Sequence, residues 1–202
     1  MLHVRGLAGF APAATATMVG DGIAKLVERA CARRGQAADA ADQATFAASY
    51  AAHVAQASRP YPGVPDTLRL LAASGWRLAL CTNKPEAPAR ALLSAFGLEA
   101  LFAAIGGGDS FPVRKPDPRH MLATLAAAGG SPDRAVAVGD HANDVAAATG
   151  AGLPCIFAGW GYGPPAIAAG AAATAAAFTE VPTLADALLR RRVRTGQDAP
   201  PR

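Results

Sequence analysis

The feature of this sequence that most constrains its fold is a regular alternation of strand-like and helix-like segments from residue 64 onward. Short apolar runs predict strands at 77–82, 101–105, 135–138 and 154–158, and helical patterns predict helices at 65–74, 86–96, 119–128, 143–149 and 183–189. Strands and helices that alternate at these lengths form βαβ units with parallel strands. We therefore predict an α/β fold, with a parallel sheet core and helices on both faces. The alanine-rich run 166–177 predicts no definite element.

A different pattern covers the first part of the chain. Apolar residues recur at helical spacing within 13–58, and the segment 59–63, Arg-Pro-Tyr-Pro-Gly, then interrupts the chain. Such a segment is typical of a hinge or linker. We therefore expect a small α-helical domain at 1–60, the sheet-containing core at 61–190 and a basic, disordered tail at 191–202.

Charge and hydropathy limit the partners of the chain. Its formal net charge is +4, and much of the basic excess lies in the tail, at Arg190, Arg191, Arg192 and Arg194. No basic stripe interleaved with aromatic residues occurs elsewhere, so we expect no nucleic-acid partner. No apolar run is long enough to span a membrane and the opening segment is a poor signal peptide, so we expect no membrane partner. The sequence predicts no oligomeric state.

Cysteine usage bears on the cellular compartment. The three cysteines, Cys31, Cys81 and Cys155, are scattered and form no Cys-x-x-Cys pair. A disulfide framework is therefore not expected, and a reducing cytoplasm is the simplest interpretation. Cys81 and Cys155 lie in apolar runs and are expected to be core residues.

The candidate functional residues come directly after the predicted strands. In an open parallel sheet, ligands bind beyond the carboxyl ends of the strands. The polar residues at these places are Thr82, Asn83, Lys115, Asp140 and Asp144. A lysine holds an ammonium over a phosphate as a compact charge, and Mg²⁺ prefers one or two carboxylates together with waters and phosphate oxygens. The ordered set of a hydroxyl, a lysine and an aspartate pair therefore predicts a phosphate and Mg²⁺ site.

Each of these residues also has a purely structural interpretation. Thr82 can cap the next helix, Lys115 can be an exposed loop residue, and Asn143 or Asp144 can cap the helix at 143–149. Capping does not explain Asp140. His141, between the two carboxylates, is better interpreted as a surface residue or as support behind the site than as a ligand. The prediction therefore depends on the ordered set and not on one residue.

Two glycine clusters suggest a nucleotide site, but neither has the required pattern. Gly20-Asp21-Gly22 precedes a predicted helix, and the segment 159–163, Gly-Trp-Gly-Tyr-Gly, follows a predicted strand. Neither completes a GxGxxG motif that opens a helix and has an acidic residue downstream. We therefore expect no dinucleotide cofactor.

Taken in order, the strand-end motifs resemble those of the haloacid dehalogenase superfamily and, within it, of the phosphoglycolate phosphatase group. The matching segments are Cys81-Thr82-Asn83-Lys84-Pro85, Arg114-Lys115-Pro116 and Val138-Gly139-Asp140-His141-Ala142-Asn143-Asp144. Softer likenesses are Gly107-Gly108-Asp109, the glycine–tyrosine loop 159–163 and the segment Val19-Gly20-Asp21-Gly22. The likeness extends over about 19–189.

The resemblance implies a Rossmann-like core with a small α-helical cap, here partial, and Mg²⁺-dependent hydrolysis of small phosphomonoesters through an aspartyl-phosphate. It implies that Thr82 binds the transferring phosphoryl group with Asn83 beside it, and that Lys115 neutralises charge there. It also implies that Asp140 ligates Mg²⁺ and that Asp144 orients Lys115 or a metal-bound water. The expected partner is a small phosphorylated metabolite, with 2-phosphoglycolate as the first choice.

The sequence departs from the family pattern at its beginning. The family opens with a strand that ends in DxDGT, whose first Asp is the nucleophile and whose second is the general acid and base, and no such motif precedes Asp21. We expect the DNA upstream of Met1 to encode this strand and motif in frame. Because the family has this strand at the centre of its sheet, we expect the chain alone to be barely stable, or to pair the flanking strands directly.

Two other functions stay open. The chain can be a catalytically inactive remnant that binds phosphate or a partner protein, and an upstream DxDGT motif would discriminate against that function. It can also be a relative of the phosphosugar mutases, which would share Thr82, Lys115 and Asp140. The cap residues match too poorly to identify the substrate.

Overall fold

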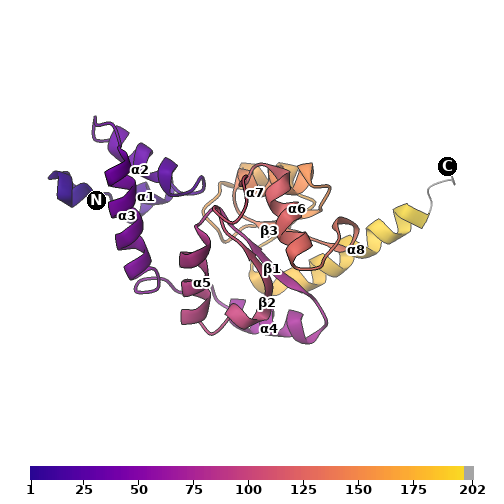
Figure 1. The fold of residues 1–202 in the computed structure, drawn as a ribbon. Helices are drawn as coiled ribbons and strands as arrows, with labels where there is room; N and C mark the ends of the chain where they lie inside the picture. Colours follow the sequence, from indigo (N-terminus) through magenta and orange to yellow (C-terminus); the bar gives the residue numbers. More distant parts are fainter. Residues whose placement is uncertain (198–202) are drawn as a thin grey trace.

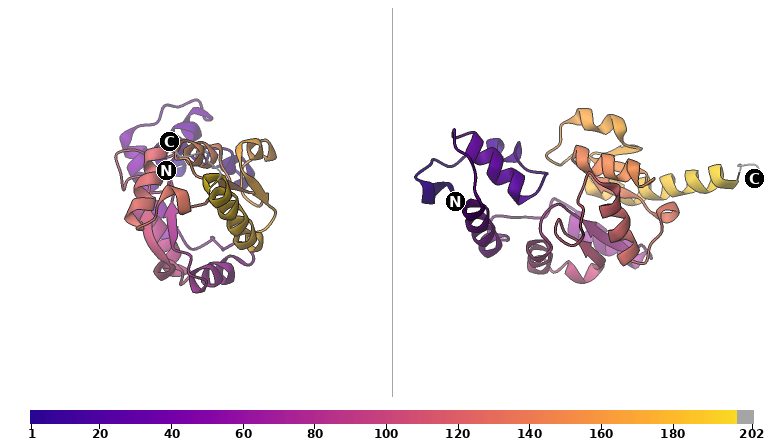
Figure 2. Two further views of the ribbon diagram at one scale, coloured as in Figure 1. Left: turned by 90° about the vertical axis from the view of Figure 1, so that its right-hand side faces the viewer. Right: turned by 45° about the horizontal axis from the view of Figure 1, so that its top comes forward.

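The computed structural model describes residues 1–197 and consists of a helical cap and an α/β core (Figure 1). The cap forms one end of an elongated molecule, and the last helix of the core extends toward the opposite end in two views (Figures 1 and 2). Within residues 1–197, no helix combines the length and the apolar character that crossing a membrane requires.

The cap consists of short helices. Their bounds are Leu2–Arg5 for a 3₁₀ turn, Pro12–Ala16 for α1, Ile23–Ala32 for α2 and Ala40–His53 for α3. Asp39 begins α3 with a capping box, in which the carboxylates of Asp39 and Asp42 each accept the backbone N–H of the other residue. Arg5 ties the 3₁₀ turn to α3 through an ion pair with Asp42 of 2.6 Å. The regular elements of residues 1–60 are therefore all helical, as the sequence predicts.

The core alternates strands with helices, as the sequence predicts. The strands are β1 Leu78–Cys81, β2 Phe102–Gly106, β3 Ala137–Gly139, β4 Cys155–Ala158 and β5 Ala173–Ala175. The helices are α4 Val64–Ala73, α5 Glu86–Ala95, α6 Pro118–Ala127, α7 Ala142–Gly150 and α8 Val181–Gln197. Short 3₁₀ turns at Glu99–Leu101, Pro132–Arg134, Pro165–Gly170 and Phe178–Glu180 lie between them.

The strands are parallel and form two separate sheets. One sheet has the order β1-β2 and the other has the order β3-β4-β5. Cys81 lies opposite Gly106, and Gly139 lies opposite Phe157. Because neighbouring parallel strands run in the same direction, the loops that follow β1 and β2 leave one edge together, as do those that follow β3 and β4. The α/β class with parallel strands is therefore confirmed.

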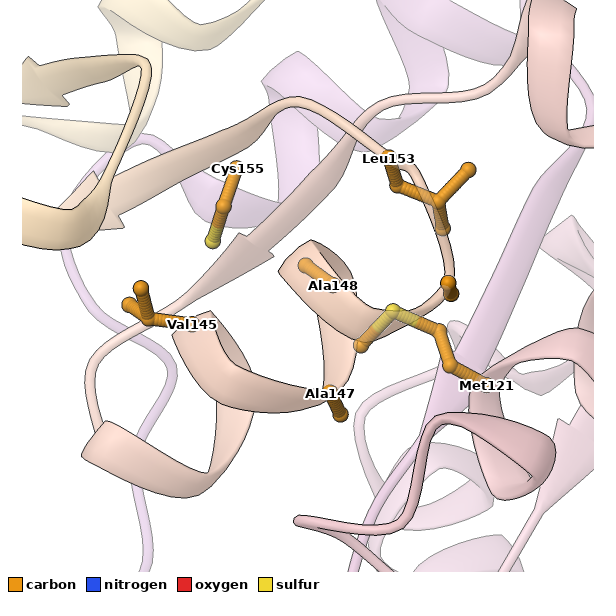
Figure 3. Packing of buried hydrophobic residues seen from close by; sticks show 7 residues of the cluster. Met121, Val145, Ala147, Ala148, Leu153 and Cys155 are labelled. Atoms are coloured by element: carbon orange, nitrogen blue, oxygen red, sulfur yellow. The ribbon is translucent and has the colours of Figure 1, made fainter.

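Helices cover both faces of the second sheet. Cys155 and Ile156 are consecutive on β4, so their side chains point to opposite faces. Cys155 packs in a cluster with residues of α6 and α7, namely Met121, Val145, Ala147 and Ala148 (Figure 3). Ile156 packs in a second cluster with residues of α8, namely Val181, Ala185 and Leu188. The burial of Cys155 also raises the pKa of its thiol to about 12, as expected for a core cysteine.

A cavity of about 640 Å³ separates the two sheets. The consecutive segments 76–81 and 135–140 both line it, which shows that the strands β1 and β3 turn their edges toward it. β1 is hydrogen-bonded only to β2, and β3 only to β4, within residues 1–197. The direct pairing of the flanking strands, expected as one alternative, is therefore not found. Instead, each strand keeps an unpaired edge that faces the cavity.

The C-terminal helix is longer than predicted. α8 continues to Gln197, so the prediction of a disordered tail is wrong for residues 191–197. Arginine is a good helix former, and the guanidinium of Arg192 donates to the carbonyl of Gly152 at 2.7 Å, so the helix continues past Leu189. Residues 198–202 of the predicted tail lie outside the described residues. The alanine-rich run contributes the 3₁₀ turn Pro165–Gly170 and the short strand β5.

Candidate active site

The predicted site residues come from the carboxyl ends of three strands. Thr82 follows β1, and its N–H donates to the carbonyl of Gly106 at the end of β2 at 2.8 Å. Asp140 follows β3, and Lys115 lies in the loop between β2 and α6. Lys115 and Asp140 both line the cavity between β1 and β3. The site and the cavity are therefore continuous.

Lys115 occupies the centre of this arrangement. Its Nζ donates to Asp144 Oδ1 and to the carbonyl oxygen of Cys81, at 2.6 Å in each case. The side chains of Lys115 and Asp144 are only 11% and 12% exposed. An ammonium has three N–H donors, so these contacts leave one donor for an anionic ligand. The ion pair fixes the charge of Lys115 beside the end of β1, where Thr82 begins the next loop.

Asp144 organises the loop that carries Asp140. While its Oδ1 accepts from Lys115, its Oδ2 accepts from the backbone N–H groups of Asp140 and His141, at 3.1 and 2.9 Å. These bonds satisfy backbone donors at the beginning of α7. The bond from Lys115 to Oδ1 fits the role of orienting Lys115, one of the two roles that the resemblance implies for Asp144. The metal-binding role of Asp144 stays a prediction.

Asp140 is held as a carboxylate by two donors. Its Oδ1 lies 3.0 Å from Nδ1 of His141, and its Oδ2 accepts from the backbone N–H of Tyr162 at 2.7 Å. Burial alone would raise the pKa of Asp140, but the hydrogen bonds from His141 and Tyr162 outweigh burial and hold that pKa below its usual range. The hydrogen bond between His141 and Asp140 also raises the pKa of His141. Asp140 is therefore ionised at neutral pH, as a metal ligand must be.

The glycine–tyrosine loop 159–163 packs directly on Asp140. A Cβ on Gly161 would collide with the Asp140 side chain, and a Cβ on Gly163 would collide with the Asp140 carbonyl oxygen. Neither glycine has a positive φ, so close approach and not backbone conformation requires glycine here. The loop can deliver the Tyr162 N–H to the carboxylate because it has no side chains at these two positions.

Gly161→Ala is expected to lower the free energy of unfolding by about 1–3 kcal/mol, because the added methyl group has no space and displaces the Asp140 carboxylate. Urea denaturation measures this difference. Gly9→Ala is the matched control, since a Cβ there meets nothing within 4 Å. We expect the control to change the free energy of unfolding by less than about 0.5 kcal/mol. Equal effects of the two substitutions would contradict the packing described here.

The donor groups fit Mg²⁺. Asp140, His141 and Asp144 each place one possible ligand atom within 4.8 Å of the others. Carboxylate oxygens suit Mg²⁺ better than imidazole does. His141 already faces Asp140 through Nδ1, which makes it a support for the carboxylate. This agrees with the interpretation of His141 as a residue behind the site.

Thr82 and Asn83 differ in whether their side chains still have a hydrogen-bond donor for a ligand. Thr82 Oγ1 accepts from the backbone N–H of Lys84 at 3.2 Å, so its hydroxyl hydrogen can still be donated to a ligand. The amide nitrogen of Asn83 donates to the carbonyls of Lys115 and Gly20, at 2.9 Å in each case. Asn83 therefore joins the Lys115 loop to the cap. Direct substrate binding by Asn83 stays a prediction.

Sequence reasoning missed two groups of the site. The backbone N–H of Tyr162 carries no signal in its residue type, and only the neighbouring glycines marked its loop. Asn143 was noted as a helix cap, but its amide nitrogen donates to Asp21 Oδ1 in the cap at 2.6 Å. A contact over 122 residues of sequence leaves no local pattern.

Comparison with known proteins gives a consistent result. The family model for haloacid dehalogenase-like hydrolases matches residues 7–152. The phosphoglycolate phosphatase of Mesorhizobium japonicum is 42% identical over 148 residues, which cover 71% of this chain and 65% of that protein. That of Cereibacter sphaeroides strain ATCC 17029 is 45% identical over 156 residues, covering 75% and 71% of the two chains. The chain thus spans about two thirds of the length of the curated relatives that it matches.

Solved structures resemble this chain over most of its length. The crystal structure of a predicted phosphoglycolate phosphatase from Haemophilus somnus has a TM-score of 0.81 at 29% identity, over 91% of this chain and 86% of that one. The structure of CbbY from Rhodobacter sphaeroides in complex with phosphate has a TM-score of 0.72 at 28% identity, over 89% and 84%. Both likenesses include the cap as well as the core, because each covers most of the chain.

Proposed function

The chain belongs to the haloacid dehalogenase-like hydrolase family, and from that premise we propose that it forms the cap and phosphate-binding core of a phosphatase of small phosphomonoesters, with 2-phosphoglycolate as substrate. One observation carries the proposal. Thr82 directly follows Cys81, whose carbonyl accepts from the mostly buried ammonium of Lys115, and Lys115 and Asp140 line the same cavity at the ends of β1 and β3. Phosphoryl transfer depends on such positioning and charge neutralisation. The names of the curated relatives support the choice of substrate.

Each residue has a distinct task in this proposal. Thr82 donates its hydroxyl hydrogen to an oxygen of the phosphoryl group. Lys115 offers its remaining N–H to a second oxygen, while Asp144 holds the ammonium in place. Because these groups are fixed before the substrate arrives, they stabilise the charge of the transition state without reorganising.

Asp140 is the residue that would hold Mg²⁺, with Asp144 close to the same position. Bound Mg²⁺ would neutralise negative charge on the phosphoryl oxygens. His141 and the Tyr162 N–H keep the Asp140 carboxylate ionised and oriented toward the site. The tight packing of the glycine–tyrosine loop on Asp140 therefore serves metal binding as well as stability.

The nucleophile is assigned to a carboxylate that is not among these residues. Both oxygens of Asp140 and both oxygens of Asp144 already accept hydrogen bonds. We propose that an extended segment, occupying the cavity between β1 and β3, supplies the attacking carboxylate. The unpaired edges of the two strands, which face the cavity, support this assignment. A strand placed there would satisfy both edges and bring its carboxyl end to Lys115.

The chemistry of that carboxylate proceeds in two displacements. Its oxygen attacks phosphorus, the bond from phosphorus to the ester oxygen breaks, and the leaving oxygen takes a proton from a second carboxyl group. Water then attacks the phosphorus of the acyl phosphate, with the same second group accepting a proton, and phosphate is released. The nucleophilic carboxylate is thereby restored.

A substrate screen tests the proposed function. The complete enzyme is here the chain together with the proposed segment that supplies the attacking carboxylate, assayed for phosphate release with Mg²⁺. We expect its kcat/KM for 2-phosphoglycolate to be at least about tenfold above that for a sugar phosphate or a nucleoside monophosphate. Small differences in a fitted pocket give about 10- to 200-fold discrimination. A clear preference for a sugar or nucleotide phosphate would reject the substrate. Failure to hydrolyse any phosphomonoester would reject the phosphatase.

A further inference from the structure

The cap contacts the loops of the candidate site at two places. Tyr50 of α3 accepts from Lys84, and the short loop Gly20-Asp21-Gly22, which precedes α2, is hydrogen-bonded to Asn83 and Asn143. The carbonyl oxygen of Gly20 accepts from Asn83 Nδ2 at 2.9 Å, and Asp21 Oδ1 accepts from Asn143 Nδ2 at 2.6 Å. Asn83 belongs to the loop after β1 and Asn143 to the first turn of α7. A single cap loop is therefore hydrogen-bonded to both strand-end loops that carry the site residues.

The loop fits against the core without spare space. Gly20 has a φ of +127°, and a Cβ on it would lie 2.8 Å from Cδ2 of His141. Gly22 has a φ of +86°, and a Cβ on it would lie 3.4 Å from a guanidinium nitrogen of Arg114 and from the carbonyl oxygen of Asn83. The positive φ favours glycine at both positions, and at Gly20 the close approach of His141 also requires it. The contact is therefore a matched fit and not a loose approach of two domains.

The loop is also fixed to its own helix. Arg29 of α2 forms an ion pair with Asp21 and donates to the carbonyl of Met18 at 3.0 Å. The hydrogen bond from Asn143, followed by that from Arg29, holds the pKa of Asp21 below its usual range despite partial burial. Asp21 is thus a charged acceptor that receives hydrogen bonds from Arg29 in the cap and from Asn143 in the core. Because Arg29 joins the loop to α2, we expect the loop and this helix to move together.

On the core side, both asparagines are joined to the phosphate-binding residues. Asn83 Nδ2 also donates to the carbonyl of Lys115 at 2.9 Å. Asn143 immediately precedes Asp144, which is paired with Lys115. The orientation of the Asn83 amide is determined, because its nitrogen faces two carbonyl oxygens and the flipped amide would place an oxygen against them.

We propose that Asn83 and Asn143 are positioning residues that lock the cap loop 20–22 over the candidate active site, with Asp21 as the charged acceptor of the lock. This inference rests on the proposed function. A locked loop covers the site and excludes water while a small phosphomonoester is bound, and a bulky ester does not fit beneath it. The lock therefore favours small substrates, and its loss affects small and bulky substrates differently.

Hydrogen–deuterium exchange of the 202-residue protein tests the lock without catalysis. We expect Asn143→Ala to speed amide exchange in the segment 20–24 by about tenfold or more, which corresponds to the loss of one hydrogen bond to a charged group. Amides of α6, which lie outside the lock, keep their rates. Lys25→Ala is the control, because this exposed residue of α2 forms an ion pair with Glu28 of the same helix. Unchanged exchange in the segment 20–24 of Asn143→Ala would overturn the proposal.

Exchanging the two polar groups provides a rescue. Asn143→Asp alone places a carboxylate against Asp21 and is expected to free the loop more than Asn143→Ala does. The double variant with Asp21→Asn restores an amide-to-carboxylate hydrogen bond in the opposite direction. We expect it to recover slow exchange at least in part, although the Arg29 pair is weakened. A double variant that exchanges as fast as Asn143→Asp would overturn the direct contact.

Kinetics of the complete enzyme separate this inference from the proposed function. We expect Asn143→Ala to lower kcat/KM for 2-phosphoglycolate by about 10- to 100-fold, and to lower kcat/KM for p-nitrophenyl phosphate by a smaller factor. Equal losses for both esters would reject the lock and leave the phosphatase intact. A complete enzyme that hydrolyses neither ester would reject the phosphatase, and the exchange experiment would still decide the lock.

Discussion

The 202-residue chain is expected to show no phosphatase turnover with Mg²⁺, and to gain turnover when an apolar strand ending in Asp-x-Asp-Gly-Thr is joined before Met1. Removing the nucleophile from a catalytic unit costs several orders of magnitude, so the gain is expected to be about 10³-fold or more. The strand would lie in the cavity of about 640 Å³ between β1 and β3 and pair with both of their free edges. Phosphate release from 2-phosphoglycolate measures the rate.

The carboxylates already at the site are each held by other groups, so we expect neither to act as the nucleophile. Asp144 accepts from Lys115 and from two backbone donors, and Asp140 is held by His141 and Tyr162. The same extension with Asn in place of its first Asp is the matched control, because it fills the cavity and lacks the nucleophile. Rapid turnover by the unextended chain, abolished by Lys115→Met, would assign the nucleophile to a residue present here. Asp144 would then be the first residue to change.

The second large effect concerns Lys115 in the complete enzyme. Lys115→Met is expected to lower kcat by about 10²–10³-fold, because it removes a preorganised charge from the phosphoryl group. It is also expected to destabilise the protein by about 3–5 kcal/mol, since it leaves the mostly buried Asp144 without its partner. Enzyme kinetics and urea denaturation measure the two effects separately.

A double variant separates these two roles of Lys115. Asp144→Asn, added to Lys115→Met, removes the unpaired charge and keeps an oxygen that can accept from the N–H groups of Asp140 and His141. We expect it to recover part of the stability and none of the activity. Lys25→Met is the surface control: its ion pair with Glu28 is exposed, and the expected change in stability is within about 1 kcal/mol. Recovery of activity together with stability would show that Lys115 acts only structurally.

Much of the core could be predicted from the sequence, because its elements differ in period and are separated by glycine and proline. The predicted strand at 154–158 and the helix at 86–96 correspond to β4 and α5 within two residues. β5 was missed, because Ala173–Ala175 is only three residues long and lies within an alanine-rich run that has no clear period. The end of α8 was misjudged, because an arginine-rich segment fits a solvated tail and a helix equally well.

The separation of the sheets could not be predicted from local pattern. Whether β1 and β3 close onto each other depends on the packing of several helices against both strands and not on residues within the strands. The sequence argument left direct pairing open, and the structure instead keeps a cavity lined by both strand edges.

Candidate site residues could be singled out from the sequence where a polar side chain follows a strand end, and their roles stay predictions. Thr82, Lys115 and Asp140 were identified because a hydroxyl, an ammonium and a carboxylate follow successive strands. The contact between Asp21 and Asn143 was not predicted, because it joins residues of the cap and the core and each residue has an ordinary local interpretation. Asn83 was placed among the substrate-binding residues, while its amide hydrogens are used by the carbonyls of Gly20 and Lys115.

The most direct test of the account is to find where the phosphoryl group becomes attached during turnover. The chain with the joined strand is mixed with Mg²⁺ and 2-phosphoglycolate, quenched in acid and mapped by mass spectrometry. We predict one phosphoryl group on the first Asp of the joined strand, and none in the variants with Asn at that position or with Lys115→Met. A phosphoryl group on any residue of the 202-residue chain, or turnover without a phosphorylated protein, would contradict the account.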